Sequence, residues 1–420
     1  MIMCSKMKLN KTLRSFSLLL IWGIAAMAIA QTSSPYSRYG IGNLQQKGST
    51  RSRMMGGTGV ANQNKTDVNN VNPSALVAMD SMAVLFDVGF HANASKFSSS
   101  EASETVYSGN LDYVSLMIPM RKYWFVSVSM QPLSSVGYDV YDTKEYNGSY
   151  GDYYGVSYSG DGGMSLATVT NSLKLPWGIS VGAETGFMWG NHDETITEYY
   201  SDMDVSYTSR QNISYYYGAW INTGMQIAQT FGKMQMILGA TYDVPTTVRS
   251  YTETSYTSSV EIIDESTGIT TKNSLPEGYG IGLSVTYDQK LTLSGDYRIK
   301  KWEDTGLGVD PQRLCNNNIY SLGAEYIPKS NSNKYIERIS YRAGAHYESG
   351  SFEVYNTPVS SAYVSAGVGL PGRLNNTLIS IGLEWGVSGG FDSRHITETY
   401  GRINVGLNLG EIWFMKPKFY

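Results

Sequence analysis

The sequence predicts an all-β protein, a transmembrane antiparallel β-barrel of about 14 strands. Three observations predict it. Apolar and polar residues alternate along segments of about ten residues or more, Tyr and Trp gather at the segment ends, and the connections alternate between short and long. A water-soluble β-sandwich shows the same alternation of side chains. In a sandwich, however, short and long connections are not expected to alternate all along the chain, so the barrel is favoured.

The alternation is clearest toward the C-terminus, where Ile379, Ile381, Leu383, Trp385 and Val387 are separated by small or polar residues. Because successive side chains of a strand point to opposite faces, each segment has one apolar and one polar face. A Lys or Arg facing lipid at mid-bilayer costs roughly 2–4 kcal/mol, so charged residues are predicted to face the lumen. The predicted lumen residues are Glu184, Asp243, Asp296, Arg298, Glu325, Arg342, His346, Glu348, Glu384, Arg402, Asn404 and Asn408.

Fourteen candidate strands follow from Met82 onward. The second, fourth, sixth, eighth, tenth and twelfth connections between them are short. The four longest of the other connections are 132–162, 191–212, 245–275 and 301–316. Bacterial barrels have short periplasmic turns and long outer loops, so both termini are predicted to be periplasmic in a Gram-negative outer membrane. The predicted strands are 82–92, 108–119, 122–131, 163–174, 177–190, 213–228, 234–244, 276–287, 290–300, 317–327, 336–348, 359–370, 376–388 and 396–409.

The first 30 residues predict a secretion signal. Basic residues precede a short apolar run at 18–27, and small residues at 28–30 suit cleavage before Gln31. Cleavage leaves Cys315 as the single cysteine, so no internal disulfide is expected. The remaining divisions are an N-terminal segment at 31–81, the barrel at 82–410 and a periplasmic tail at 411–420.

The composition gives no sign of nucleic-acid binding or catalysis. The formal net charge is only −4, which lacks the basic footprint of a nucleic-acid-binding protein. The chain has no phosphate-binding loop and no serine-elbow pattern, and its four histidines lack metal-ligand spacing. We therefore expect no enzyme activity, no cofactor and no metal.

The segment 51–79 resembles the hatch of the FadL-type outer-membrane transport family. The residues that carry the resemblance are Met54, Met55, Gly56, Gly57 and Gly59, followed by Asn72, Pro73 and Ser74, where Ser replaces the family's usual Ala. That family has a 14-stranded barrel with an N-terminal hatch, in agreement with the count made here from the strand pattern. The resemblance implies that residues 31–81 fold inside the barrel as a plug. Turn chemistry alone also explains Gly, Asn and Pro in such a segment.

The resemblance further implies passive uptake of hydrophobic small molecules such as long-chain fatty acids. Met54 and Met55 suit irregular apolar contacts, and Arg298, Arg342 and Arg402 are candidates to meet a carboxylate. Packing of the hatch and ion pairing in the lumen explain the same residues equally well.

Two other functions stay open. FadL-like barrels include attachment components of type IX secretion, and the Tyr-rich connections 132–162 and 245–275 suit a protein partner. An aqueous porin is the third option, which a filled lumen disfavours. The expected partners are therefore outer-membrane lipid, a hydrophobic ligand and, in the alternative, a secreted or surface protein.

Overall fold

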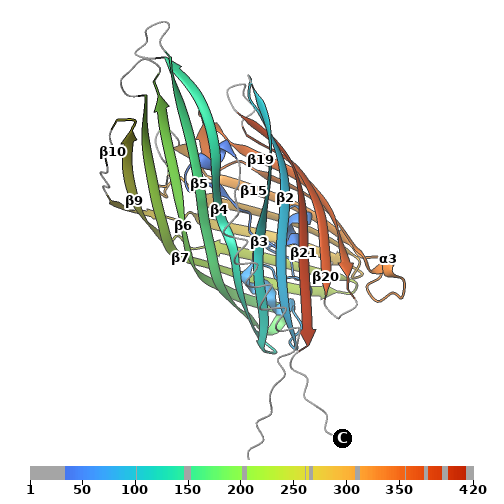
Figure 1. Cartoon of the computed structure of the whole chain (residues 1–420). Coiled ribbons are helices and arrows are strands. Elements are labelled where there is room, and N and C mark those ends of the chain that lie inside the picture. The colour runs from blue at the N-terminus through green and yellow to red at the C-terminus, as the bar shows by residue number, and fades with distance from the viewer. Residues whose placement is uncertain are drawn as a thin grey trace, which may run out of the picture.

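The computed structural model describes residues 34–100, 102–145, 153–200, 206–260, 262–263, 268–307, 313–354, 356–372, 377–389 and 396–412. Fourteen long strands form one closed antiparallel barrel, which confirms the predicted fold class (Figure 1). The barrel closes where the first of these strands, β2, pairs with the last, β21. The barrel strands are β2 (Ala83–Ser98), β3 (Ser103–Arg121), β4 (Trp124–Glu145), β5 (Tyr153–Lys174), β6 (Ile179–Tyr199), β7 (Tyr207–Phe231), β8 (Met234–Asp243), β12 (Glu277–Tyr287), β13 (Leu291–Lys301), β15 (Asn317–Tyr326), β16 (Ser340–Glu348), β19 (Ser360–Pro371), β20 (Leu378–Gly389) and β21 (Thr397–Ile412).

The remaining elements are short and lie in the N-terminal segment or in the connections. No helix among the described residues is long and apolar enough to cross a bilayer. These elements are η1 (Pro35–Arg38), β1 (Asn43–Leu44), α2 (Thr50–Met54), η2 (Pro73–Ala78), η3 (Pro176–Gly178), β9 (Thr247–Ser258), β10 (Ile262–Ile263), β11 (Ile269–Ser274), β14 (Arg313–Leu314), α3 (Tyr335–Arg338), β17 (Phe352–Val354) and β18 (Thr357–Pro358).

The outer surface of the barrel is an apolar band between two levels of aromatic residues. Outward side chains such as Leu383 and Trp385 are 60% and 70% exposed, an arrangement that suits lipid and not water. On the β6 side, Trp177 and Trp189 mark the two levels. The chain between them spans about 40 Å when extended, or roughly 30 Å across the membrane at a strand tilt of ~40°. That height matches the hydrocarbon core of a bilayer.

Four neighbouring strands, β4 to β7, continue well beyond the aromatic level and form a tall wall at the long-loop end (Figure 1). β9 adds to β7 within this wall, and β11 adds to β9. The prediction that 132–162, 191–212 and 245–275 are loops is therefore wrong for most of their described residues. These segments are rich in Ser, Thr and Tyr, which suit paired strands. They lie beyond the lipid-facing level, so they lack the apolar alternation that identified the other strands.

Smaller differences concern the ends of predicted strands. Residues 336–338, predicted to begin a strand, belong to the short helix α3 instead. The last strand continues to Ile412, two residues past the predicted end of the barrel, because Glu411 and Ile412 still pair with β2. The predicted signal at 1–30 and residues 413–420 of the predicted tail lie outside the described residues, and so do the chain ends whose side of the membrane was predicted.

The N-terminal segment, residues 34–81, lies inside the barrel (Figure 1). It begins at the level of the outer part of β4, where the N–H of Ser34 donates to the carbonyl of Gly137 at 2.9 Å. It ends at the short-turn end, where β2 starts. Every residue from Ser49 to Ala61 is buried, so this stretch forms much of the interior packing.

Candidate functional site

Glycines on the inner face of the barrel let the N-terminal segment approach the wall closely. At each of them, an added Cβ would meet an atom of the segment, and at four of them the nearest such atom is main chain. Gly344, for example, faces the backbone of Met55 and Gly56. The absence of side chains here is therefore part of the fit between segment and wall. These wall glycines are Gly182, Gly224, Gly239, Gly282, Gly323, Gly344, Gly367, Gly382 and Gly406.

The predicted hatch motif turns sharply at Gly56 and Gly57, where it lies against this wall. Gly56 and Gly57 have φ angles of +66° and +78°, a region that L side chains rarely adopt. A Cβ on Gly56 would also lie 2.5 Å from the carbonyl oxygen of Leu322. Both glycines are thus required by backbone conformation, and Gly56 also by space.

Asp296 on β13 secures the next part of the motif. Its Oδ2 accepts hydrogen bonds from the N–H groups of Gly59 and Val60, at 2.6 and 2.9 Å. Such bonds to a charged acceptor are stronger than bonds between neutral groups. The segment is therefore attached to the wall by its main chain.

Asn72, Pro73 and Ser74 start the helix η2. The side chain of Asn72 accepts from the N–H of Ser74 at 3.0 Å and donates to the carbonyl of Val60 at 2.7 Å. Pro73 occupies the first turn, where a missing N–H costs nothing. The motif thus serves as a helix cap and as a bridge between two parts of the segment.

Glu325 on β15 binds two arginines. Its carboxylate accepts two hydrogen bonds from Arg51 of α2, at 2.7 and 3.1 Å, and a third from Nε of Arg342 at 2.7 Å. The three side chains are at most 7% exposed. Arg342 also donates to Ser380 at 3.0 Å, so this cluster ties the segment to three barrel strands.

A second charged cluster surrounds Asp112, a buried residue of β3. Arg402 on β21, His91 on β2 and Arg53 of α2 lie 3.0, 2.8 and 3.5 Å from Asp112 Oδ1. The cluster therefore joins the first two barrel strands, the last strand and the N-terminal segment.

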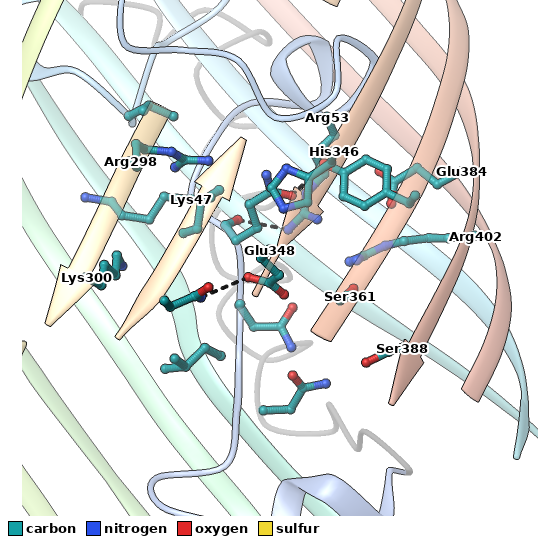
Figure 2. A pocket seen from close by; sticks show the side chains of 18 of the residues that line it. Lys47, Arg53, Arg298, Lys300, His346, Glu348, Ser361, Glu384, Ser388 and Arg402 are labelled. Carbon is teal, nitrogen blue, oxygen red and sulfur yellow. Dashed lines mark hydrogen bonds between the residues drawn. The ribbon is translucent and has the colours of Figure 1, made fainter. Parts of the chain in front are cut away.

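A cavity of about 220 Å³ remains between the segment and the wall (Figure 2). Its lining is polar and carries charges of both signs. Arg298 and Lys300 project into it from β13, opposite Glu348, whose carboxylate accepts from Asn317 at 3.2 Å. Within the described part of the chain, Arg298 and Lys300 have no carboxylate within 4.0 Å, and Nε and Nη2 of Arg298 are buried without a hydrogen-bond partner.

An apolar cluster adjoins this cavity on the side of the tall wall. A small pocket within the cluster shares Leu44, Asp243 and Lys300 with the charged cavity. Lys47, which also lines the cavity, pairs with Glu184 and lies 4.8 Å from the ring of Trp220. Charged and apolar surfaces thus meet at one place. The buried members of the cluster are Ile41, Leu133, Met164, Leu166, Met188, Trp220, Val248, Leu275, Trp302 and Leu307.

The residues predicted to bind ligand divide into two groups. Arg298 and Arg402 line the cavity, although Arg402 is paired with Asp112. Met54, Met55 and Arg342 do not line it: the methionines pack against wall glycines, and Arg342 is held by Glu325. Lys300 is a cavity residue that was not predicted. It lies two positions after Arg298 on one strand, so the alternation that placed Arg298 inward also places Lys300 inward.

Metal binding finds no support in the geometry. Across the ranges given above for the structure, His, Cys, Asp and Glu form no group of three or more that could hold a metal ion.

A family model described as BamG matches residues 10–420, nearly the whole chain. The chain belongs to the BamG family. No curated protein matches this BamG-family chain in sequence.

Several solved structures have a fold similar to that of this BamG-family barrel. The CymD monoaromatic hydrocarbon channel is 15% identical with a TM-score of 0.58, and the match covers 88% of this chain and 98% of CymD. The Ralstonia pickettii toluene transporter TbuX is 14% identical with a TM-score of 0.56, covering 86% and 98%. A Pseudomonas aeruginosa FadL homologue is 10% identical with a TM-score of 0.57, covering 88% and 99%. These matches confirm the FadL-type fold that the motif at 54–74 predicted.

Proposed function

We propose that this BamG-family barrel lets hydrophobic molecules with an anionic head group, such as long-chain fatty acids, pass the outer membrane passively. The observation that carries the proposal is the pair Arg298 and Lys300, which faces a cavity beside a buried apolar cluster and has no carboxylate within 4.0 Å among the described residues. An amphiphile satisfies both surfaces at once.

The electrostatic argument starts from the cost of a buried charge. Arg298 and Lys300 are half-buried, and two cations in such a site are unfavourable unless anions compensate them. Asp243 and Glu348 line the same cavity but lie beyond 4.0 Å from both. A carboxylate accepts two hydrogen bonds from a guanidinium such as Arg298, and Lys300 adds a second positive charge. The acyl chain of the same ligand would lie against Trp220 and Trp302 of the apolar cluster.

The proposal includes the role of the N-terminal segment as a hatch. Its ion pairs with Glu325 and Asp112 hold it in the lumen, and a ligand leaving the cavity for the short-turn end has to pass it. The named functions of the structural neighbours, a hydrocarbon channel and a toluene transporter, support a role in uptake. They are functions of those proteins, at 15% identity or less.

The same proposal places the chain in the outer membrane of a Gram-negative cell. The predicted signal at 1–30 directs secretion, the short-turn end faces the periplasm together with both termini, and the tall wall faces outward. Accessibility of an epitope inserted after residue 147, in intact cells, tests this orientation. Labelling only after the cells are opened would contradict it.

Uptake in a deletion strain tests the function. We expect loss of fatty-acid uptake on deletion, and a strong decrease with Arg298→Gln combined with Lys300→Gln. Lys233→Gln, an exposed lysine in a short turn, is the matched control and should transport normally. Mass spectrometry of gently purified protein should find a retained anionic amphiphile. Undiminished uptake together with lipid-free protein would contradict the proposal.

A second candidate function is the binding of a secreted or surface protein partner. The observation that favours it is the tall wall, whose strands extend far beyond what the bilayer needs and expose Tyr141, Tyr199 and Tyr251. Aromatic side chains exposed on a rigid sheet suit protein recognition. A stoichiometric partner that co-purifies with the wild-type protein, and is lost when the wall above Pro132 is shortened, would support it.

A further inference from the structure

β3 and β4 pair only in the half of the barrel nearer the short-turn end. Their register runs from Arg121 opposite Trp124 to Val114 opposite Met130, and it stops there. Beyond that point, β3 continues paired with β2, and β4 continues paired with β5. The two described strand edges separate toward the long-loop end and leave a seam in the barrel wall (Figure 1).

A bulge on each strand accounts for the seam. Asp112 is an extra residue in β3, and Leu133 is an extra residue in β4 directly after Pro132. Bulges bend a strand and increase its twist, and Pro132 has no N–H for a ladder. Asp112 binds Arg53 inside the barrel, and Leu133 joins the apolar cluster. The contacts that hold the N-terminal segment therefore also separate the strands.

The chain itself uses part of the exposed edge of β4. β1 pairs with Ser134 and Ser135, and the N–H of Gln45 donates to the carbonyl of Leu133 at 2.9 Å. Ser34 donates to the carbonyl of Gly137 at 2.9 Å, and the N–H of Gly137 donates to Ser37 Oγ at 3.0 Å. This edge therefore accepts hydrogen bonds from an added extended segment.

The edge continues past the part that the described residues cover. The peptide groups of a strand point alternately to its two neighbours, so those of Asp139 and Tyr141 point the same way as that of Gly137, away from β5. In the ranges described, no strand lies against them. Tyr141 is 67% exposed, and Asp139 and Asp142 are exposed carboxylates without an ion pair among the described residues.

We infer that the edge of β4 from Asp139 to Thr143 binds an extended, basic segment of a second polypeptide by strand addition. The N–H and C=O groups of Asp139 and Tyr141, which pair with no other described segment, supply the main-chain bonds of such an addition. Asp139 and Asp142 favour lysine or arginine in the incoming segment. The binding continues the ladder that residues 34–45 begin on the same edge. It is separate from ligand uptake, since Arg298 and Lys300 take no part in it.

Amide hydrogen exchange on the full chain in detergent micelles tests the inference. The probe is a synthetic peptide of alternating lysine and valine residues, and a peptide of alternating glutamate and valine is its control. In the free protein, the amides of Asp139 and Tyr141 should exchange quickly. The lysine peptide should slow them by about tenfold or more, because exchange requires the added strand to leave. The glutamate peptide should leave them fast.

Two variants separate the main chain from the side chain. Tyr141→Pro removes the N–H that faces the seam and should abolish the effect of the peptide, while the β4–β5 bonds of its neighbours stay in place. Tyr141→Ala keeps that N–H and should still bind. Heat-modifiable gel migration checks that both variants fold, and the exchange measurement on the unsubstituted protein depends on neither.

Three outcomes would overturn the inference. The first is slow exchange of both amides in a peptide-free monomer, since the chain would then fill its own edge. The second is slow exchange in a peptide-free protein with the mass of a dimer, since the occupant would be a second copy. The third is an equal effect of both peptides, or of neither, since the edge would then not select an extended basic segment.

Discussion

Replacing Glu325 with Gln tests whether the buried ion cluster holds the N-terminal segment in the barrel. The substitution keeps the size of the side chain and removes the charge that compensates Arg51 and Arg342. Each pair, with charge centres about 4 Å apart, is worth roughly 4 kcal/mol at an effective dielectric of ~20. Loss of a single partner from a buried pair typically destabilises a protein by about 3–5 kcal/mol, because a buried charge loses its counterion.

We therefore expect Glu325→Gln to lower the free energy of unfolding by about 3–5 kcal/mol. Urea unfolding in lipid vesicles, followed by tryptophan fluorescence, measures this. Glu337→Gln is the matched control, because Glu337 lies in the short helix α3 and forms an exposed pair with Lys334 at 3.8 Å. Such a pair contributes about 0–1 kcal/mol.

A double variant makes the test specific for charge. Glu325→Gln leaves two arginines without their carboxylate, whereas Glu325→Gln with Arg51→Met leaves only Arg342. The double variant should therefore be more stable than Glu325→Gln alone. A Glu325→Gln protein as stable as the Glu337→Gln control, or a double variant whose losses simply add, would refute the reasoning.

Three further predictions concern the packing of the segment and the thiol of Cys315. Gly344→Ala should destabilise the protein by about 1–3 kcal/mol, because its Cβ would meet the backbone of Gly56, whereas Gly401→Ala, whose Cβ has open space, should be neutral in the same urea assay. Asp296→Asn should cost about 1.5–3 kcal/mol, because the N–H groups of Gly59 and Val60 lose a charged acceptor; equal stability of Asp296→Asn and the turn variant Asp288→Asn would contradict this. Burial, with Glu353 and Glu303 nearby, raises the pKa of the Cys315 thiol to about 11. In a Cys4→Ser background, alkylation at pH 8 should be roughly two orders of magnitude slower than for free cysteine, and its rate should rise with pH up to about 11; a rate like that of free cysteine would contradict the burial.

The membrane-spanning part of the fold was predictable because lipid imposes a simple pattern. Ile379 to Val387 alternate since one face meets hydrocarbon and the other meets the lumen, and the whole barrel repeats this rule. The wall above the bilayer was missed for the same reason. Outward residues such as Asp193 and Thr195 of β6 face no lipid there, so their segments show no apolar alternation.

The candidate site was predictable only in part. The alternation places Arg298 inward, and it would place Lys300 inward as well, but it does not say which lumen charges remain unpaired. Arg298 and Arg342 look alike in sequence. One faces a cavity, and the other is held by Glu325, because their positions differ relative to a segment that lies more than 200 residues earlier in the chain. The bulges at Asp112 and Leu133 depend on the same distant contacts.

The position of Asp112 has a consequence for how the molecule is assembled. This carboxylate contacts Arg402 of the last strand, His91 of the first strand and Arg53 of the interior segment. Its neighbours therefore come from both ends of the polypeptide. Pairing of β2 with β21 and binding of Arg53 to Asp112 therefore stabilise each other.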